Sequence, residues 1–153
     1  MIFKLYTRFF QLTQYPLYIA RYGVNLKNFN GYGIKLQGEG RIVFSNNSYI
    51  SFGSYINSSK GYEVVVGDDT SIGHNVTVYT SSIDVLHFVA LGKRQKIQGS
   101  VVIGNNCFIG SGVFIGPGVT IGDGSIIGAN VVLTKSVRPG SIIGQQNTLT
   151  TLK

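Results

Sequence analysis

Large aliphatic residues recur every six positions between residues 103 and 139. The series consists of Ile103, Ile109, Ile115, Ile121, Ile127 and Leu133. Four positions after each of them comes a small or β-branched residue: Cys107, Val113, Val119, Ser125, Val131 and Val137. An amphipathic helix would space its apolar residues by three and four positions, and a half-buried strand would alternate them. A fixed period of six instead predicts a parallel β-solenoid, in which each repeat forms one short strand and one corner.

Three repeats predict one triangular coil of about 18 residues, and successive coils stack at about 4.8 Å, the spacing of paired strands. The aliphatic residue at position i points into the prism, and the residue at i+4 fills the corner beside it. The first five aliphatic residues are each followed by a glycine: Gly104, Gly110, Gly116, Gly122 and Gly128. We expect this glycine to permit the tight bend, because it has no Cβ to clash.

The repeat continues upstream with two interruptions. The step of six holds for Phe44, Ile50 and Ile56, and again for Val66, Ile72 and Val78. Residues 58–63 break the phase, and residues 23–43 predict an irregular first coil. The next aliphatic residue in register after Val78 is Ile97, so residues 81–96 predict a projecting loop. The solenoid therefore spans residues 23–140, and residues 141–153 form a C-terminal tail.

Residues 1–22 are aromatic, aliphatic and basic, with no acidic residue. Lys4, Arg8, Pro16 and Arg21 interrupt the segment too often for a transmembrane helix, which needs about 20 mostly apolar residues. A signal peptide would need an unbroken apolar region and a cleavage site of small residues. Two interpretations stay open: a cap over the end of the solenoid, or a segment that lies in a membrane interface.

The composition favours one domain with little helix: 153 residues include 21 glycines, no tryptophan and 12% charged residues. The net charge of +7 is uneven, because all five basic residues before position 39 precede the first acidic residue, Glu39. Since no nucleic-acid-binding motif is present, we expect an anionic cofactor or anionic lipid as partner. The single Cys107 excludes a disulfide framework. We therefore expect a cytoplasmic protein, with residues 1–22 available for peripheral contact at the inner face of the membrane.

The repeated Ile-Gly-x-x-Val/Ser-x pattern, which covers roughly residues 44–139, resembles that of the hexapeptide-repeat acyltransferases. The most similar branch acetylates sugars and polysaccharide intermediates. The resemblance implies an all-β, left-handed parallel β-helix, an exception to the usual right-handed crossover. It also implies a homotrimer with active sites between subunits, acetyl-CoA as acyl donor without a metal, and a sugar or lipid-linked oligosaccharide as acceptor.

Acyl transfer to a hydroxyl needs a base and a donor that stabilises the oxyanion. The family carries its catalytic histidine in the loop before the main Ile-Gly run, which implies His87 as general base. By the same resemblance, the backbone N–H of Ser111 is the oxyanion donor. Asp84 is assigned to the acceptor site, where it either orients His87 or remains a solvated charge. His74 follows Ile-Gly at a corner that faces solvent, and we assign it a structural role.

The resemblance also implies a coenzyme A groove along the coil corners of neighbouring subunits. Its residues would be Phe108, Gly110, Ala129, Thr134, Lys135 and Arg138. Phe108 would form an aromatic wall, Ala129 would let the pantetheine amide approach the backbone, and Lys135 and Arg138 would neutralise phosphates. The alternative is that these are ordinary solvent-facing corners. Asn57 is a candidate for contact with the acceptor sugar.

Three further features of the sequence bear on other kinds of chemistry. Two interpretations of the basic cluster Lys93, Arg94 and Lys96 stay open. It binds an anionic acceptor or the coenzyme, or it is an ordinary solvated part of the loop. Cys107 occupies an i+4 position and is expected to be a packed small residue. A zinc carbonic anhydrase of this fold would need three histidine ligands, and the chain has two histidines.

The leading hypothesis is transfer of an acetyl group from acetyl-CoA to a sugar hydroxyl in cell-surface polysaccharide or lipopolysaccharide biosynthesis. N-acetylation of an amino sugar and a non-catalytic structural solenoid are the alternatives.

Overall fold

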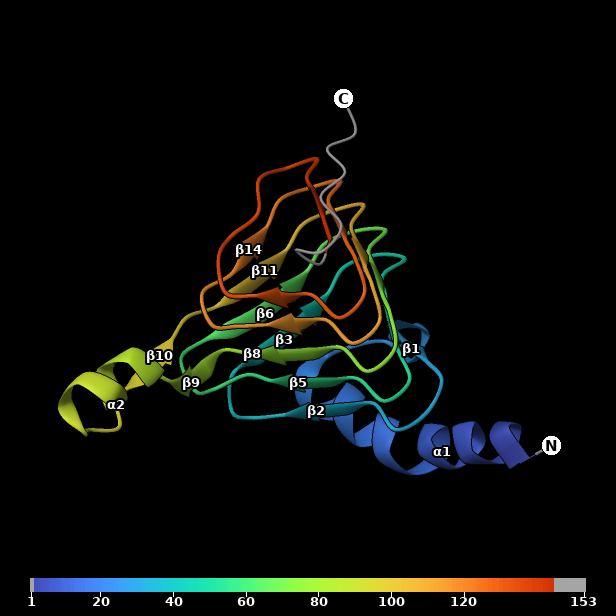
Figure 1. Ribbon diagram of the computed structural model, residues 1–153. Helices are drawn as coiled ribbons and strands as arrows, with labels where there is room; N and C mark the ends of the chain where they lie inside the picture. Colours follow the sequence, from blue (N-terminus) through green and yellow to red (C-terminus); the bar gives the residue numbers. More distant parts are fainter. Residues whose placement is uncertain (1, 145–153) are drawn as a thin grey trace.

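The computed structural model describes residues 2–144, which form a triangular prism of stacked coils (Figure 1). Its strands lie in three parallel sheets, here called faces A, B and C. Face A contains β1 (Phe29–Asn30), β4 (Tyr49–Ser51), β7 (Ser71–Ile72), β12 (Phe108–Ile109), β15 (Ile126–Ile127) and β17 (Ile142–Ile143). Face B contains β2 (Lys35–Gln37), β5 (Tyr55–Asn57), β8 (Thr77–Tyr79), β13 (Phe114–Ile115) and β16 (Val132–Leu133). Face C contains β3 (Arg41–Phe44), β6 (Glu63–Val66), β11 (Val101–Ile103) and β14 (Thr120–Ile121).

Neighbouring strands of a face come from successive coils and pair in parallel. On face A, Ile109 pairs with Ile72 on one side and with Ile127 on the other. On face B, Ile115 pairs with Leu133 in the same way. Equivalent positions of the repeat therefore stack directly above one another, and the predicted parallel sheets are confirmed.

The residues that repeat every six positions form the core. Between residues 103 and 133, the fully buried members are Ile103, Ile109, Ile115, Ile121 and Ile127. The residues at i+4 are buried as well: Cys107, Val113, Val119, Ser125 and Val131. Each fully buried isoleucine contributes roughly 1.5–3 kcal/mol relative to an exposed one, so these columns dominate the stability of the prism. Cys107 is a packed small residue, as predicted.

The expected role of the glycine at i+1 was wrong. The left-handed bend falls two residues later, at i+3, where Asn106 has a φ of 54° and Gly112 a φ of 70°. The glycine at i+1 is instead required by the close approach of the next coil. A Cβ on Gly110 would lie 2.6 Å from the backbone nitrogen of Ala129, and a Cβ on Gly104 would lie 2.8 Å from that of Asp123.

Buried hydroxyl groups connect successive coils at the corner between faces C and A. Thr70 Oγ1 donates to the carbonyl of Gly104 at 2.7 Å and accepts from the backbone N–H of Cys107 at 3.0 Å. One coil earlier, Ser48 Oγ donates to the carbonyl of Gly67 and accepts from the N–H of Thr70. These bonds satisfy backbone groups at a corner, between the strands of adjoining faces.

The prediction of an all-β chain was incomplete, because residues 2–22 form the helix α1 (Ile2–Tyr22) across the base of the prism (Figure 1). A short 3₁₀ helix, η1 (Leu26–Asn28), leads into the first coil. Tyr15 is fully buried and stacks on Phe29 with ring centroids 4.2 Å apart. Its hydroxyl donates to the carbonyl of Gly31 at 3.0 Å. One side of α1 therefore covers the first coil.

Residues 81–98 leave the prism between β8 and β11 and form an arm (Figure 1). It consists of β9 (Ser81–Ile83), the helix α2 (Val85–Leu91) and β10 (Lys96–Gln98), and β9 pairs with β10 in antiparallel fashion. The predicted return to register at Ile97 was wrong. Ile97 pairs with Ser82 in the arm and is 46% exposed, whereas Val101 is the first buried aliphatic residue after the arm.

Candidate active site

The arm is defined locally by the two caps of α2. Asp84 is the N-cap residue, and its Oδ1 accepts a hydrogen bond from the backbone N–H of His87 at 2.9 Å. Gly92 ends the helix in a left-handed conformation with a φ of 64°, and its N–H donates to the carbonyl of Phe88. These caps fix the position of His87 in the first turn of α2.

His87 is half-buried, and Asp84 meets its backbone rather than its ring. Within residues 2–144, no side chain forms a hydrogen bond with the imidazole. Asp84 thus has a structural role in this chain, as a helix cap, that the sequence analysis did not anticipate.

A cavity of about 330 Å³ lies between the arm and the next coils of the prism. The arm contributes Ser82, Ile83, Asp84, Val85, Leu86 and Ile97, and the prism contributes Phe114, Gly116, Pro117 and Thr134. The cavity brings together two of the predicted site residues, Asp84 from the acceptor set and Thr134 from the coenzyme set. Its walls are mainly apolar, and they also carry the carboxylate of Asp84 and the hydroxyls of Ser82 and Thr134. Such a composition is typical of small-molecule sites.

The oxyanion donor proposed from the sequence lies at a different corner of the prism. Ser111 follows β12, at the turn from face A to face B, whereas the arm leaves the turn from face B to face C. Its Oγ accepts from the backbone N–H of His74 at 3.4 Å, and its carbonyl accepts from the N–H of Asn130 at 2.8 Å. A single chain therefore does not bring Ser111 and His87 together.

The predicted coenzyme residues are divided among the corners in the same way. The backbone of Ala129 lies against Gly110, at the corner of Ser111. Lys135 follows Thr134 at the corner of the arm, and Arg138 lies one corner further along the chain. Lys135 and Arg138 are exposed, as is Ala129. Phe108 is 54% exposed on the outer side of face A.

Asn57 belongs to a polar group on the outer side of face B. Its Nδ2 donates to the hydroxyl of Tyr55 at 2.9 Å, and that hydroxyl donates to Gln37 Oε1 at 2.7 Å. The structure thus places Asn57 outside the lining of the arm cavity.

His74 is exposed at its corner, as predicted, and its ring contacts Phe52 edge to face at 4.8 Å. Across residues 2–144, no three histidine, cysteine or carboxylate side chains gather into a group that could hold a metal ion.

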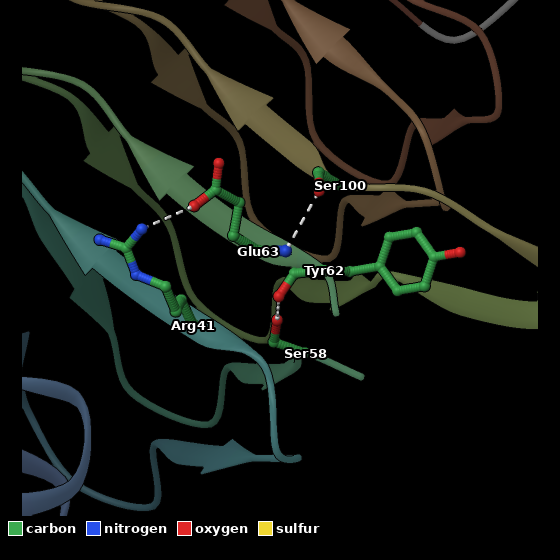
Figure 2. A network of polar contacts seen from close by, with 5 residues as sticks. All are labelled: Arg41, Ser58, Tyr62, Glu63 and Ser100. Atoms are coloured by element: carbon green, nitrogen blue, oxygen red, sulfur yellow. Dashed lines mark hydrogen bonds and ion pairs between the residues drawn. The ribbon is translucent and has the colours of Figure 1, made fainter. Parts of the chain in front are cut away.

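A second cavity, which was not predicted from the sequence, lies at the corner of the arm. This cavity of about 380 Å³ is lined by Glu39, Gly40, Arg41, Gly61, Tyr62, Glu63 and Ser100. Figure 2 shows the polar contacts that shape it: Arg41 pairs with Glu63 at 3.4 Å, and Ser100 Oγ accepts from the N–H of Glu63 at 3.1 Å. The Arg41–Glu63 pair is too exposed to contribute much stability. The only signal in the sequence was the break in phase at residues 58–63.

Part of the chain matches the model of a known protein family. Residues 100–135 match the family model described as bacterial transferase hexapeptide (six repeats). No sequence among the curated proteins matches the chain.

Solved structures resemble the chain over most of its length. A hexapeptide-repeat acetyltransferase from Vibrio cholerae is 25% identical, with a TM-score of 0.62 over 88% of this chain and 75% of that one. The structure of this acetyltransferase from Vibrio cholerae O1 biovar eltor, complexed with acetyl-CoA, is 26% identical. Its TM-score is 0.61 over 92% of this chain and 76% of that one. A galactoside acetyltransferase in complex with coenzyme A is 30% identical, with a TM-score of 0.54 over 76% of this chain and 60% of that one.

Proposed function

We propose that the chain transfers an acetyl group from acetyl-CoA to a sugar hydroxyl, because its repeat matches the hexapeptide transferase model and its fold resembles hexapeptide-repeat acetyltransferases. The acceptor would be a sugar of a cell-surface polysaccharide or lipopolysaccharide pathway. The neighbours that carry acetyl-CoA or coenzyme A support the donor. The observation that carries the proposal for this chain is the arm: its residue Asp84 lines an apolar cavity with polar groups and caps the helix turn that carries His87.

The active protein is a homotrimer of left-handed prisms in this proposal. The separation of His87 from Ser111 within one chain supports it, because a second subunit can supply the missing corner. The arm is also apolar where it is exposed: Leu86 is 84% exposed and Val89 78% exposed. On the outer side of face A, Phe108, Ile126 and Ile142 form an exposed apolar column. Exposed apolar surfaces of this kind mark interaction sites, and burial between subunits would remove them from water.

The chemistry requires two groups of the protein. The His87 imidazole removes the proton of the acceptor hydroxyl as its oxygen attacks the thioester carbonyl carbon. The backbone N–H of Ser111 donates to the oxyanion that forms there. When the carbon–sulfur bond breaks, the imidazolium returns its proton to the departing thiolate. The products are the acetylated sugar and free coenzyme A.

The residues assigned to the coenzyme have the size, polarity and charge that contact with it would require. Ala129 is exposed and small, so an amide of the pantetheine arm can approach the backbone there. Phe108 and Thr134 offer an apolar wall and a hydroxyl, and the exposed Lys135 and Arg138 can reach phosphates. Asn57 and Asp84 are assigned to the acceptor.

A coupled thiol-release assay with acetyl-CoA and a panel of sugars tests this function. We expect His87→Ala to lower kcat by a factor of about 10² or more, because a general base typically contributes that much. His74→Ala is the comparison variant: it removes an exposed imidazole at the corner of Ser111 but leaves the backbone N–H that meets Ser111, so kcat should fall much less than in His87→Ala. Gel filtration and circular dichroism would establish that both variants keep their fold and assembly.

The alternatives give different results in the same experiments. Release of thiol only with amino sugars would indicate N-acetylation. Absence of acetyl-CoA binding by calorimetry, together with an unchanged His87→Ala variant, would leave a structural solenoid.

A further inference from the structure

α1 has two apolar sides, of which only one is used by the fold. The inner side carries Tyr15, Tyr18 and Tyr22, which pack against the core of the prism. The hydroxyl of Tyr22 donates to the carbonyl of Gly38 at 2.9 Å, in addition to the bond from Tyr15 to Gly31. The helix is therefore held rigidly against the first coil.

The other side of α1 carries an exposed apolar stripe, here called the outer stripe. Its members are Ile2, Leu5, Phe9, Leu12, Pro16 and Ile19. They are spaced by three and four residues, which places them along one side of the helix. Ile2 and Leu5 are each 70% exposed and Leu12 is 71% exposed. Because burial of the tyrosines already orders the helix, this apolar surface exists before any partner binds.

The charges beside the outer stripe are all positive. Lys4 and Arg8 are exposed one helical turn apart, so they lie on the same flank of α1. Arg21, by contrast, faces the prism, where its Nη2 donates to the carbonyl of Gly38 at 2.9 Å, and α1 contains no acidic residue. The first acidic residue of the chain is Glu39.

We propose that the outer stripe docks α1 flat on a bilayer that contains anionic lipids. An apolar stripe flanked by lysine and arginine is the arrangement of an interfacial amphipathic helix, whose cations meet lipid phosphates. The helix lies on the surface rather than crossing it: within residues 2–144, no helix is long and apolar enough to span a membrane. This inference concerns α1 alone and is independent of the proposed acetyl transfer.

Charge favours the bilayer over a second copy of the chain as the occupant. If two α1 helices packed through their outer stripes, Lys4 and Arg8 of each would approach the cations of the other. No acidic side chain on α1 could compensate them, and like charges in such contact are destabilising.

Co-sedimentation of the full chain with vesicles tests the proposal. We expect binding to vesicles of phosphatidylglycerol and phosphatidylethanolamine, and at least tenfold weaker binding to phosphatidylcholine alone. The double variant Leu5→Glu with Leu12→Glu should lower the binding to anionic vesicles at least tenfold. Lys4→Glu with Arg8→Glu should lower it several-fold, and most strongly at low salt, where charges are least screened.

The matched control places the same kind of change on two faces of the prism away from α1. Val102 on face C and Val132 on face B are 37% and 66% exposed, so Val102→Glu with Val132→Glu is expected to bind anionic vesicles like the unchanged chain. Circular dichroism checks that each variant is folded. If the variant at Leu5 and Leu12 does not fold, the variant at Lys4 and Arg8 decides the test.

Two outcomes would overturn the proposal. One is equal binding of the unchanged chain and of both α1 variants to anionic vesicles. The other is the absence of vesicle binding together with a smaller oligomer in the variant at Leu5 and Leu12, measured by light scattering. That second result would assign the outer stripe to another copy of the chain.

Discussion

A left-handed backbone recurs at position i+3 of the repeat, and only three residue types occupy it. They are Gly53, Gly112, Gly118 and Gly124, together with Asn47, Asp69, Asn75, Asn106 and Asn130. Glycine has no Cβ, and the short polar side chains of asparagine and aspartate tolerate this conformation better than others. The corner therefore depends on one residue in six, and this dependence can be tested directly.

Asn106→Val is expected to destabilise the protein by about 1–2 kcal/mol, because a β-branched residue is strained at a φ of 54°. Asn106→Gly should be nearly neutral or slightly stabilising. Urea denaturation measures both. Asn46→Val serves as the control, since Asn46 is an exposed corner residue without a left-handed backbone. An equal loss in the two valine variants would contradict the explanation.

The burial of the Tyr15 hydroxyl should make the stability of the protein depend on pH. Burial raises the pKa of its hydroxyl from 10.0 to about 12. The folded chain thus holds this proton more tightly than the unfolded chain, so the contribution to stability is complete below pH 10 and is lost between pH 10 and about 12. We expect Tm to fall over this range, and to fall less in Tyr15→Phe. Tyr49→Phe, on face A, should keep the full decline; identical declines in the two variants would refute the assignment.

At the scale of the element, the corner between faces C and A is stabilised by buried hydroxyl groups as well as by packing. Thr70 connects its own coil to the next one, because its hydroxyl donates to Gly104 and accepts from Cys107. Its side chain cannot be replaced by an apolar one of the same shape without leaving two backbone groups unpaired.

Thr70→Val is accordingly expected to lower the free energy of unfolding by about 1–3 kcal/mol. Thr77→Val, on face B, makes the same change of shape at a partly exposed position and should have little effect. Guanidinium denaturation of both variants measures the difference. If they are equally stable, the hydroxyl bonds of Thr70 contribute no more than its packing.

The core of the prism was predictable because its period is imposed by geometry: an aliphatic residue such as Ile109 must face inward once per strand. The gap in the period predicted a projecting segment, but it did not predict that this segment forms a helix between two antiparallel strands. Ile97 lies six residues before Ile103 and so fitted the period, yet it belongs to the antiparallel pair of the arm. The helical spacing of Tyr15, Tyr18 and Tyr22 was visible and would have indicated α1.

The site was less predictable than the fold. Phe114 and Pro117 line the arm cavity, yet in the sequence they are ordinary members of the repeat. Sequence position alone also does not reveal that Ser111 and His87 lie at different corners. Those facts depend on how the coils stack and where the arm leaves them.

At the scale of the molecule, the arm is separable from the prism. None of its side chains is buried, and β9 and β10 pair with each other rather than with a face. It therefore contributes to surfaces and not to the core.

Replacement of residues 83–96 by a short Gly-Ser turn should leave Tm within a few degrees of the parent, because no core contact is lost. In the proposed trimer, we expect the same deletion to abolish acetyl transfer and to lower the trimer fraction, measured by light scattering. A deletion that lowers Tm sharply would mean that the arm stabilises the prism. A fully active deletion would remove His87 from the mechanism.

The insertion point of the arm also affects how the chain folds. Stacked corner residues are 37 positions apart where the arm intervenes, compared with 18 in the following coil. Since doubling the length of a flexible loop costs only about 0.6 kcal/mol of closure entropy, this junction should form roughly threefold more slowly than a regular one. A change in the length of the arm would then alter the folding rate only slightly. The residues beside the cavity can therefore differ between related proteins without loss of stability in the coil beneath them.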